Sequence, residues 1–169
     1  MRDLNYYSIM CIRDLEIIGI ELGKITKFSV NTRAKKRWGQ CVMFPDKHYE
    51  ININVNLLRE DIPLDGLKST LYHELLHTCK NCFDHGKQWS AYAARVEQYY
   101  GIKVNRTESA YDKGFTEEQV KAYNENRIEY KFVCKGCGQK VNRMRASAFV
   151  KHPDRYQCAI CHNKFERVA

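Results

Sequence analysis

The chain has 169 residues, 44% of them hydrophobic, so it can bury an ordinary core and global disorder is excluded. Its formal net charge of +8 favours an acidic partner such as nucleic acid, although surplus lysine also serves solubility alone. No run approaches the roughly 20 apolar residues of a membrane span. Residues 1–23 carry scattered charges instead of the apolar stretch of a signal peptide. We therefore expect a soluble, cytoplasmic protein, monomeric by default, with no membrane partner.

The first 56 residues predict a helix followed by a small sheet. Apolar residues recur at three- and four-residue steps over 3–22, which is typical of an amphipathic helix, and Gly23 can end it. Residues 25–56 contain three short β-type runs and predict a small antiparallel sheet. The expected strands are Ile25–Val30, Trp38–Phe44 and Tyr49–Val55.

A second predicted helix begins near Pro63, runs to about Cys82 and contains an H-E-x-x-H motif that starts at His73. Residues four apart on a helix differ by about 40° in direction, so the imidazoles of His73 and His77 point to one side. Both can then bind one zinc ion at about 2.0–2.1 Å. Glu74 lies about 100° around the helix, where it is poorly placed as a ligand but can contact a water on the metal.

The rest of this helix supports a functional interpretation of the motif. Its apolar residues fall roughly 120° to 260° away from His73, so they would pack on the core while the histidines face a cleft. The motif also occurs by chance in unrelated proteins. The identity of a third ligand therefore decides how far the interpretation holds.

Three candidates compete for the third ligand. His85 follows the helix on a short turn, where Gly86 would let the chain fold back toward the metal. Glu97 lies twenty residues after the motif on the next predicted helix, the spacing of a thermolysin-like ligand. Cys79 and Cys82 form a C-x-x-C pair, which we interpret as packing because Cys79 faces the core. We favour His85, since a turn that ends a helix is a natural place for a ligand, and Glu97 stays open as the alternative.

Further along the chain, a third helix is predicted to end at Gly101, and a short helix is predicted over 116–124. From Tyr130 the sequence changes to cysteine pairs and basic residues. We therefore expect two domains, residues 1–128 and 129–169. The apolar stripe of the third helix consists of Trp89, Ala93, Val96 and Tyr100.

Four of the eight cysteines form two C-x-x-C pairs separated by twenty residues. This spacing is typical of a zinc ribbon, in which two tight knuckles complete a tetrahedral site with sulfur about 2.3 Å from the metal. Such a closed site serves folding instead of catalysis. His162 directly follows the second pair, but the partner pair and the missing export signal argue against attached haem. The expected ligands of this structural zinc are Cys134, Cys137, Cys158 and Cys161.

The charge is concentrated at the C-terminal end. Residues 131–169 contain nine Lys or Arg and two Asp or Glu, whereas the first 130 residues carry a net charge of only +1. Basic side chains can neutralise phosphates, and the aromatic rings of Phe149 and Tyr156 can stack on unpaired bases. The alternative is that both rings fill the small ribbon core and the charges face solvent. The candidate nucleic-acid-binding residues are Lys140, Arg143, Arg145, Lys151 and Arg155.

These motifs together resemble the SprT-like metallopeptidase family, which includes bacterial SprT and the eukaryotic Spartan proteases. The resemblance rests on the HELLH motif, on His85 in an H-G-x-x-W context, and on an upstream R-W-G-x-C segment that begins at Arg37. It covers roughly residues 1–105 and 130–165. It implies a zincin-like domain followed by a zinc ribbon.

The resemblance also implies roles for particular residues. His73, His77 and His85 would bind the catalytic zinc, and Glu74 would be the catalytic acid and base. The resemblance does not supply a second donor to the developing oxyanion. Tyr72, Tyr92 and Arg37 can be considered for this role, but we favour a structural role for each of them.

We therefore predict an α+β protein in which a zincin-like metallopeptidase domain, with helices and a small antiparallel sheet, precedes a small β-rich zinc ribbon. It would carry two zinc ions, one catalytic and one structural. The expected function is a zinc-dependent endopeptidase, in which Glu74 assists the attack of a zinc-bound water on peptide bonds. By resemblance, its protein substrates would be bound or crosslinked to DNA.

Two other functions compete with this prediction. The chain would be a nucleic-acid-binding or regulatory zinc protein if its peptidase fold were inactive, but the intact Glu74 argues against that. It would be a general cytosolic peptidase if the ribbon were only a structural cap or a protein-docking surface.

Overall fold

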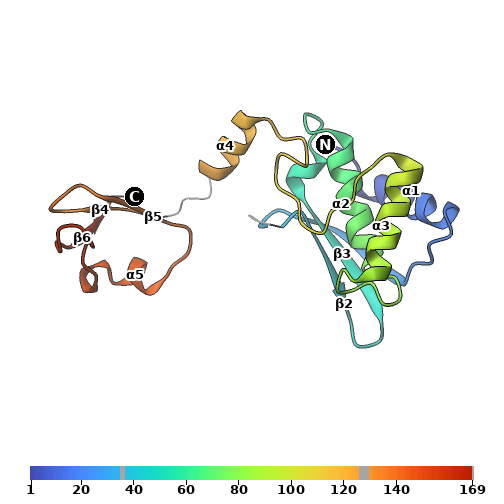
Figure 1. Cartoon of the computed structure of the whole chain (residues 1–169), viewed down its shortest axis with the longest axis horizontal. Helices are drawn as coiled ribbons and strands as arrows, with labels where there is room; N and C mark the ends of the chain where they lie inside the picture. Colours follow the sequence, from blue (N-terminus) through green and yellow to red (C-terminus); the bar gives the residue numbers. More distant parts are fainter. Residues whose placement is uncertain (35–36, 126–129, 169) are drawn as a thin grey trace. The chain divides into compact units, whose positions relative to one another are not determined.

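The computed structural model describes residues 1–34, 37–125 and 130–168. The chain divides into two compact units, Met1–Thr116 and Glu117–Ala169 (Figure 1). The domain boundary predicted at residue 128 lies outside the described residues. Within the described parts, no helix is both long and apolar enough to cross a membrane.

The first unit combines helices with a three-stranded sheet, as the α+β prediction requires (Figure 1). The first helix ends at Ile17, five residues before the predicted end, because Gly19 takes up a left-handed backbone (φ 73°) and leaves Gly23 outside the helix. The elements are α1 (Leu4–Ile17), β1 (Lys24–Asn31), β2 (Gly39–Met43), β3 (His48–Asn54), the 3-10 turn η1 (Val55–Leu58), α2 (Leu64–Leu76) and α3 (Lys87–Tyr100).

The helix that carries the H-E-x-x-H motif is shorter than predicted. It ends at Leu76 instead of Cys82, so His77 is its C-terminal cap. The backbone N–H of Thr78 donates to the carbonyl of Leu75 at 2.9 Å, and the Thr78 hydroxyl donates to the same carbonyl at 2.8 Å. These short-range bonds tighten the last turn and replace the next α-helical turn.

The sheet is mixed, so the prediction of a purely antiparallel sheet is wrong in one pairing. β2 pairs antiparallel with β3, as expected from the turn between them, but β1 pairs parallel with β3, in the order β1-β3-β2. Asn54, at the end of β3, contacts two described residues between β1 and β2. Its side-chain amide donates to the carbonyls of Ala34 (2.9 Å) and Arg37 (3.0 Å).

Helix α2 lies at the centre of the first unit. It packs against α1, α3, β2 and β3. Its apolar face is buried as predicted, opposite the histidines of the motif. A fully buried core of this kind supplies the rigid support that a catalytic constellation requires. The core includes Leu15, Ile51, Ile53, Leu67, Leu71 and Leu75.

The second unit contains a small antiparallel sheet with the order β5-β4-β6. Phe132, Phe149 and Val150 form its buried core, so Phe149 fills the interior, which is the structural alternative considered for it. Tyr156 is 40% exposed and its ring lies against the edge of Phe149, 5.3 Å between centroids. The elements are α4 (Glu117–Glu125), β4 (Tyr130–Cys134), β5 (Lys140–Arg143), α5 (Ala148–Lys151), the 3-10 turn η2 (Pro153–Arg155) and β6 (Phe165–Arg167).

Candidate metal centres

The three histidines singled out by the sequence converge in the first unit. His73 and His77 lie at the end of α2, and His85 lies on the turn before α3. The Nε2 atom of His73 is 3.2 Å from Nε2 of His77 and 2.9 Å from Nε2 of His85. One ring nitrogen from each histidine can serve as a ligand, and these atoms all lie within 4.8 Å of one another.

The backbone fixes the protonation pattern of two of these rings. Nδ1 of His73 lies 3.0 Å from the carbonyl oxygen of Asn105, and Nδ1 of His77 lies 3.0 Å from that of Cys82. A carbonyl oxygen only accepts, so each Nδ1 carries the proton and each Nε2 presents a lone pair.

Two lone pairs 3.2 Å apart cannot hydrogen-bond to each other, and a cation between them makes the contact favourable. Three nitrogens at 2.0–2.1 Å from one tetrahedral ion would lie about 3.3 Å apart, close to the distances observed. The donor set therefore fits a zinc ion bound by three imidazoles.

The surroundings of the three rings keep them neutral. Burial, with added repulsion from His77, lowers the pKa of His73 to about 3. Burial also lowers the pKa values of His77 and His85. Neutral imidazole is the form that binds a metal ion, so these histidines are ready to do so at neutral pH.

The turn that carries His85 differs from the one expected. The residue with the unusual backbone is His85 itself (φ 57°), whereas Gly86 has an ordinary φ of −71°. Asp84 stabilises the turn, because its Oδ1 accepts the backbone N–H of Gly86 at 3.0 Å. A left-handed histidine is uncommon, and strained backbone of this kind clusters at functional sites.

Trp89 packs against all three imidazoles. Its ring centroid lies 5.0 Å from that of His73, 6.1 Å from that of His77 and 4.7 Å from that of His85. The sequence assigned Trp89 to the apolar stripe of α3, and it is indeed only 3% exposed. Helical spacing does not reveal that the same ring restrains the histidine cluster.

The two alternatives for a third ligand lie elsewhere. Glu97 is exposed on α3 and belongs to neither metal-ligand cluster among the described residues. Cys79 is buried, which raises the pKa of its thiol to about 12 and keeps it neutral. Cys82 contributes through its backbone carbonyl to His77, a role that a side-chain motif cannot indicate.

Glu74 lies beside the histidines with its carboxylate almost enclosed, 6% exposed. Burial raises its pKa to about 7, against the opposing effects of the Cys41 backbone N–H and the charges of Lys113 and Arg37. Gly39 on β2 leaves room for this carboxylate, because a Cβ there would lie 2.6 Å from its Oε1. A carboxylate with a pKa near 7 suits a general base at neutral pH.

Recesses open on both sides of Glu74. One has a volume of about 240 Å³ and extends toward Phe83, and the other has a volume of about 140 Å³ and extends toward Asn105. Both are lined by Glu74, His73 and Gly39. Because β2 is an edge strand of its sheet, the cleft runs along unpaired backbone that an extended peptide can reach.

A buried ion pair supports the wall of the smaller recess. Lys113 is 1% exposed, and its Nζ donates to Ser69 Oγ at 2.9 Å and pairs with Glu108. The indole N–H of Trp38 donates to the carbonyl of Glu108 at 3.2 Å. The segment that supplies the carbonyl of Asn105 to His73 is thus hydrogen-bonded both to α2 and to Trp38, the residue before β2. A lysine in a polar stretch carries no sequence signal for such a role.

The structure distinguishes between the three candidates for a second oxyanion donor. The Tyr72 hydroxyl is directed away from the cleft, because it donates to Asp14 at 2.6 Å and the side chain is fully buried. Tyr92 is half-buried on α3, with the guanidinium of Arg95 5.7 Å from its ring. Only Arg37 lines a recess beside Glu74.

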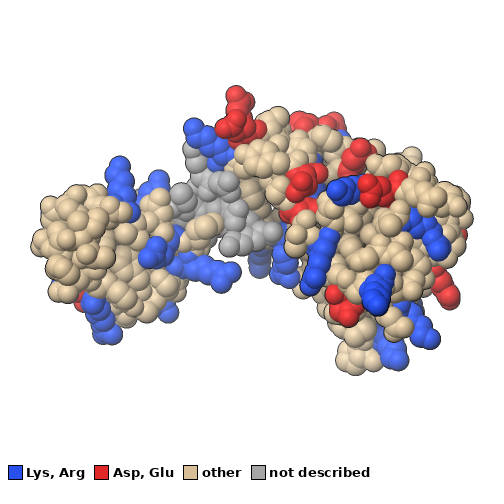
Figure 2. All heavy atoms as spheres, viewed as in Figure 1, with Lys and Arg blue, Asp and Glu red and all other residues tan. Residues whose placement is uncertain are grey.

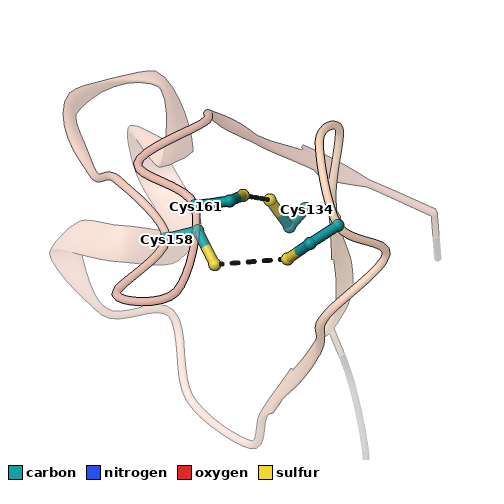
Figure 3. A group of neighbouring side chains, drawn as sticks. Cys134, Cys158 and Cys161 are labelled. Carbon is teal, nitrogen blue, oxygen red and sulfur yellow. Dashed lines mark hydrogen bonds between the residues drawn. The ribbon is translucent and has the colours of Figure 1, made fainter.

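In the second unit, the four cysteines of the C-x-x-C pairs also converge. Figure 3 shows Cys134, Cys158 and Cys161 directed toward one another from two loops. The sulfur atoms of Cys134 and Cys161 are 3.3 Å apart, and those of Cys137 and Cys158 are 3.6 Å apart. A disulfide would need about 2.05 Å, whereas sulfurs around one tetrahedral zinc lie about 3.8 Å apart. The donor set fits a closed zinc site.

The two knuckles of this cluster share one backbone pattern. The N–H of Cys134 donates to the carbonyl of Gln139, and the N–H of Cys158 to that of Asn163, both at 2.9 Å. The fifth residue of each knuckle is left-handed, Gly138 with φ 72° and His162 with φ 58°. His162 therefore occupies a turn position that glycine occupies in the other knuckle.

Backbone N–H groups favour the thiolate form of two of the four cysteines, whereas hydrogen bonds among the sulfurs and burial raise the pKa of Cys137. The N–H of Asn163 lowers the pKa of Cys161 to about 6, and the N–H of Ile160 lowers that of Cys158. The thiolate is the form that binds zinc, so lower pKa values favour the metal complex.

The predicted nucleic-acid-binding residues are all exposed, and Figure 2 shows basic side chains over this unit with few acidic ones beside them. A recess of about 350 Å³ lies nearby, lined in part by Phe149, Tyr156 and Phe165. The guanidinium of Arg143 lies 5.2 Å from the Phe149 ring centroid at this recess. The five basic residues are Lys140, Arg143, Arg145, Lys151 and Arg155.

The fold and the two ligand clusters define an α+β protein with possible sites for two metal ions, one cluster of histidines and one of cysteines. The model of the SprT-like family matches residues 19–110, which is more than half of the chain. The chain therefore belongs to the SprT-like family, which is generally associated with zinc metallopeptidase-like proteins. Neither the curated proteins nor the solved structures contain a match to this chain.

Proposed function

We propose that this chain is a zinc-dependent endopeptidase that acts on proteins bound or crosslinked to DNA. One observation carries the proposal: three imidazole nitrogens converge beside the buried carboxylate of Glu74, in a cleft next to an edge strand. His73, His77 and His85 would hold the catalytic zinc. When bound there, the ion supplies a Lewis acid that polarises the scissile carbonyl.

The protein's own groups perform the rest of the chemistry. The Glu74 carboxylate accepts a proton from the attacking water and returns it to the leaving amine. The Cys41 N–H and the space above Gly39 hold this carboxylate in place. The free edge of β2 aligns an extended peptide through hydrogen bonds to the peptide backbone, which is common to all sequences.

The cysteine cluster supports the second half of the proposal. A zinc ion bound by the four cysteines would stabilise the small ribbon. The basic side chains around it would bind DNA phosphates, and the exposed ring of Tyr156 would offer a stacking surface for a base. Proteins held on that DNA would be brought to the peptidase unit as substrates.

The decisive experiment compares the full chain with Glu74→Gln, using a basic DNA-binding protein as substrate with and without DNA. Cleavage by Glu74→Gln is expected to fall about 10²- to 10⁴-fold, because the general base is removed. Metal analysis should still find two zinc ions in the variant. Undiminished cleavage by Glu74→Gln would contradict the mechanism, and an inactive wild-type chain with normal zinc would favour a regulatory protein.

The DNA part is tested separately by neutralising Arg143, Arg145 and Lys151 together with glutamine. DNA affinity should fall, and its dependence on salt should weaken by about 0.9 in the logarithmic slope for each phosphate that is no longer neutralised. A matched triple replacement of Arg13, Lys24 and Lys27 in the first unit serves as the control. Equal effects of the two triple variants would favour a general peptidase with a structural ribbon.

A further inference from the structure

Two arginines beside the catalytic cleft are not used in the catalytic steps proposed above. Arg37, which precedes β2, and Arg106, in the segment after α3, both line the recess of about 140 Å³ that also contains Glu74 and His73. Both side chains are exposed. Neither guanidinium forms a hydrogen bond or ion pair with any other residue that the structure describes.

Charge in this recess is not balanced by its acidic residues. Glu108 also lines the recess, but Lys113 pairs with its carboxylate from the buried side. With Lys113 included, three basic side chains therefore stand against the two carboxylates of Glu74 and Glu108.

Resting on the proposed function, we infer that this recess is a subsite for a carboxylate of the peptide substrate, held by Arg37 and Arg106. An arginine fork matches the planar geometry of a carboxylate. The volume of about 140 Å³ is below the roughly 300–1,000 Å³ of typical ligand pockets, so it suits one side chain and not a nucleotide. The carboxylate comes from a Glu or Asp next to the scissile bond, or from the C-terminus of the substrate.

The test uses matched peptides that carry Glu, Gln or Lys in turn on each side of the scissile bond, and a pair ending in a free or an amidated C-terminus. For one of these positions, kcat/KM should be about tenfold higher with the carboxylate than with its neutral counterpart. Lys at that position should be the poorest substrate. The internal and terminal peptides separate the two sources of the carboxylate.

Variants connect this preference to the two arginines. Arg37→Gln and Arg106→Gln should each lower the Glu-to-Gln ratio of kcat/KM, and the double variant should bring it close to one. Arg106→Glu should reverse the preference in favour of Lys. Arg13→Gln, which removes an exposed arginine on α1, should keep the wild-type ratio.

Several results would overturn this inference. A wild-type ratio near one would do so, as would an equal loss of kcat on all peptides in Arg37→Gln, which would indicate a role at the oxyanion. A loss of DNA affinity in the double variant with an unchanged peptide ratio would assign the arginines to phosphate.

The proposed function fails separately if the wild-type chain cleaves none of the peptides. In that event, binding of the Glu and Gln peptides to zinc-loaded Glu74→Gln protein, followed by fluorescence anisotropy, decides the subsite. Tighter binding of the Glu peptide that depends on both arginines supports it, and equal binding refutes it.

Discussion

The histidine cluster and the cysteine cluster differ in what holds their ligands in place. His73 and His77 extend from a helix packed on five other elements, and backbone carbonyls orient both rings. The four cysteines lie on two short knuckles, above a core made by Phe132, Phe149 and Val150. The first cluster is held by several packed elements, whereas the second is held by two short hydrogen-bonded turns over a small core.

Under the proposed function, one chain would use zinc in two ways. A catalytic site must keep its geometry while substrates and products come and go, so its support comes from packing and hydrogen bonds. A ribbon of about forty residues cannot bury enough surface to fold alone, so metal binding and folding are coupled. The following predictions test that contrast, from the largest expected effect to the smallest.

Removal of zinc should affect the two units very differently. With a strong chelator, amide protection in residues 130–168 is expected to fall by at least about 10³-fold, because the ribbon loses its main source of stability. Amides of α2 should change far less, since the packed core around them remains. Hydrogen exchange followed by mass spectrometry measures both regions in one sample. Equal loss of protection in both units would contradict the contrast.

Lys113→Met should lower the stability of the first unit by breaking a buried ion pair. The substitution leaves the carboxylate of Glu108 buried without its cation, and such a loss lowers the free energy of unfolding by about 3–5 kcal/mol. Urea unfolding of the variant measures the change. The double variant Lys113→Met/Glu108→Leu should recover most of it, because no unpaired charge remains.

A surface ion pair supplies the control for this effect. Arg59 and Asp61 are both about half exposed, so Arg59→Met should change the free energy of unfolding by less than about 1 kcal/mol. If Lys113→Met is no worse than Arg59→Met, the ion pair does not support the wall of the recess.

Replacing a glycine by alanine should affect catalysis in the first unit and stability in the second. In Gly39→Ala, the new Cβ would lie 2.6 Å from the Glu74 carboxylate and displace it, so kcat should fall about 10²-fold with zinc retained. In Gly138→Ala, the Cβ meets no atom within 4 Å, but φ is 72°. That variant should destabilise the ribbon by about 1 kcal/mol and leave peptide cleavage unchanged. Peptide assays and zinc analysis of both proteins distinguish the outcomes.

The smallest effect is expected at His162. Because this residue holds the left-handed position that Gly138 holds in the other knuckle, His162→Gly should stabilise the zinc-bound ribbon by about 1 kcal/mol. Competition with a chelator would register this as tighter zinc binding. Weaker binding would show that the imidazole itself contributes to the cysteine site.

Much of this arrangement could be predicted from local patterns. The spacing of the histidines and the cysteine pairs identified side chains that do converge, since one helical turn and one tight knuckle are short-range geometries. The third helix ends at Gly101 as predicted, with φ 67° at that glycine. The family resemblance is confirmed over residues 19–110.

The supporting contacts could not be predicted in the same way. Every residue has a carbonyl, so nothing in the sequence distinguishes those of Cys82 and Asn105 as partners of the histidines. The parallel pairing of β1 with β3 depends on where the chain crosses, not on the alternation within each strand. The pairing of Lys113 with Glu108 depends on burial created by residues far apart along the chain.

The backbone of His85 has a further consequence for the helix that follows it. The N–H of Gly86 donates to the Asp84 side chain, and its carbonyl begins α3 by accepting the N–H of Ser90 at 3.0 Å. A bond from His85 to zinc would offset the strain of its left-handed conformation, so occupancy of the site and fraying of the first turn of α3 would be thermodynamically linked. Whatever loosens the start of this helix would weaken the protein's hold on its metal, and a full site would in turn stiffen the helix.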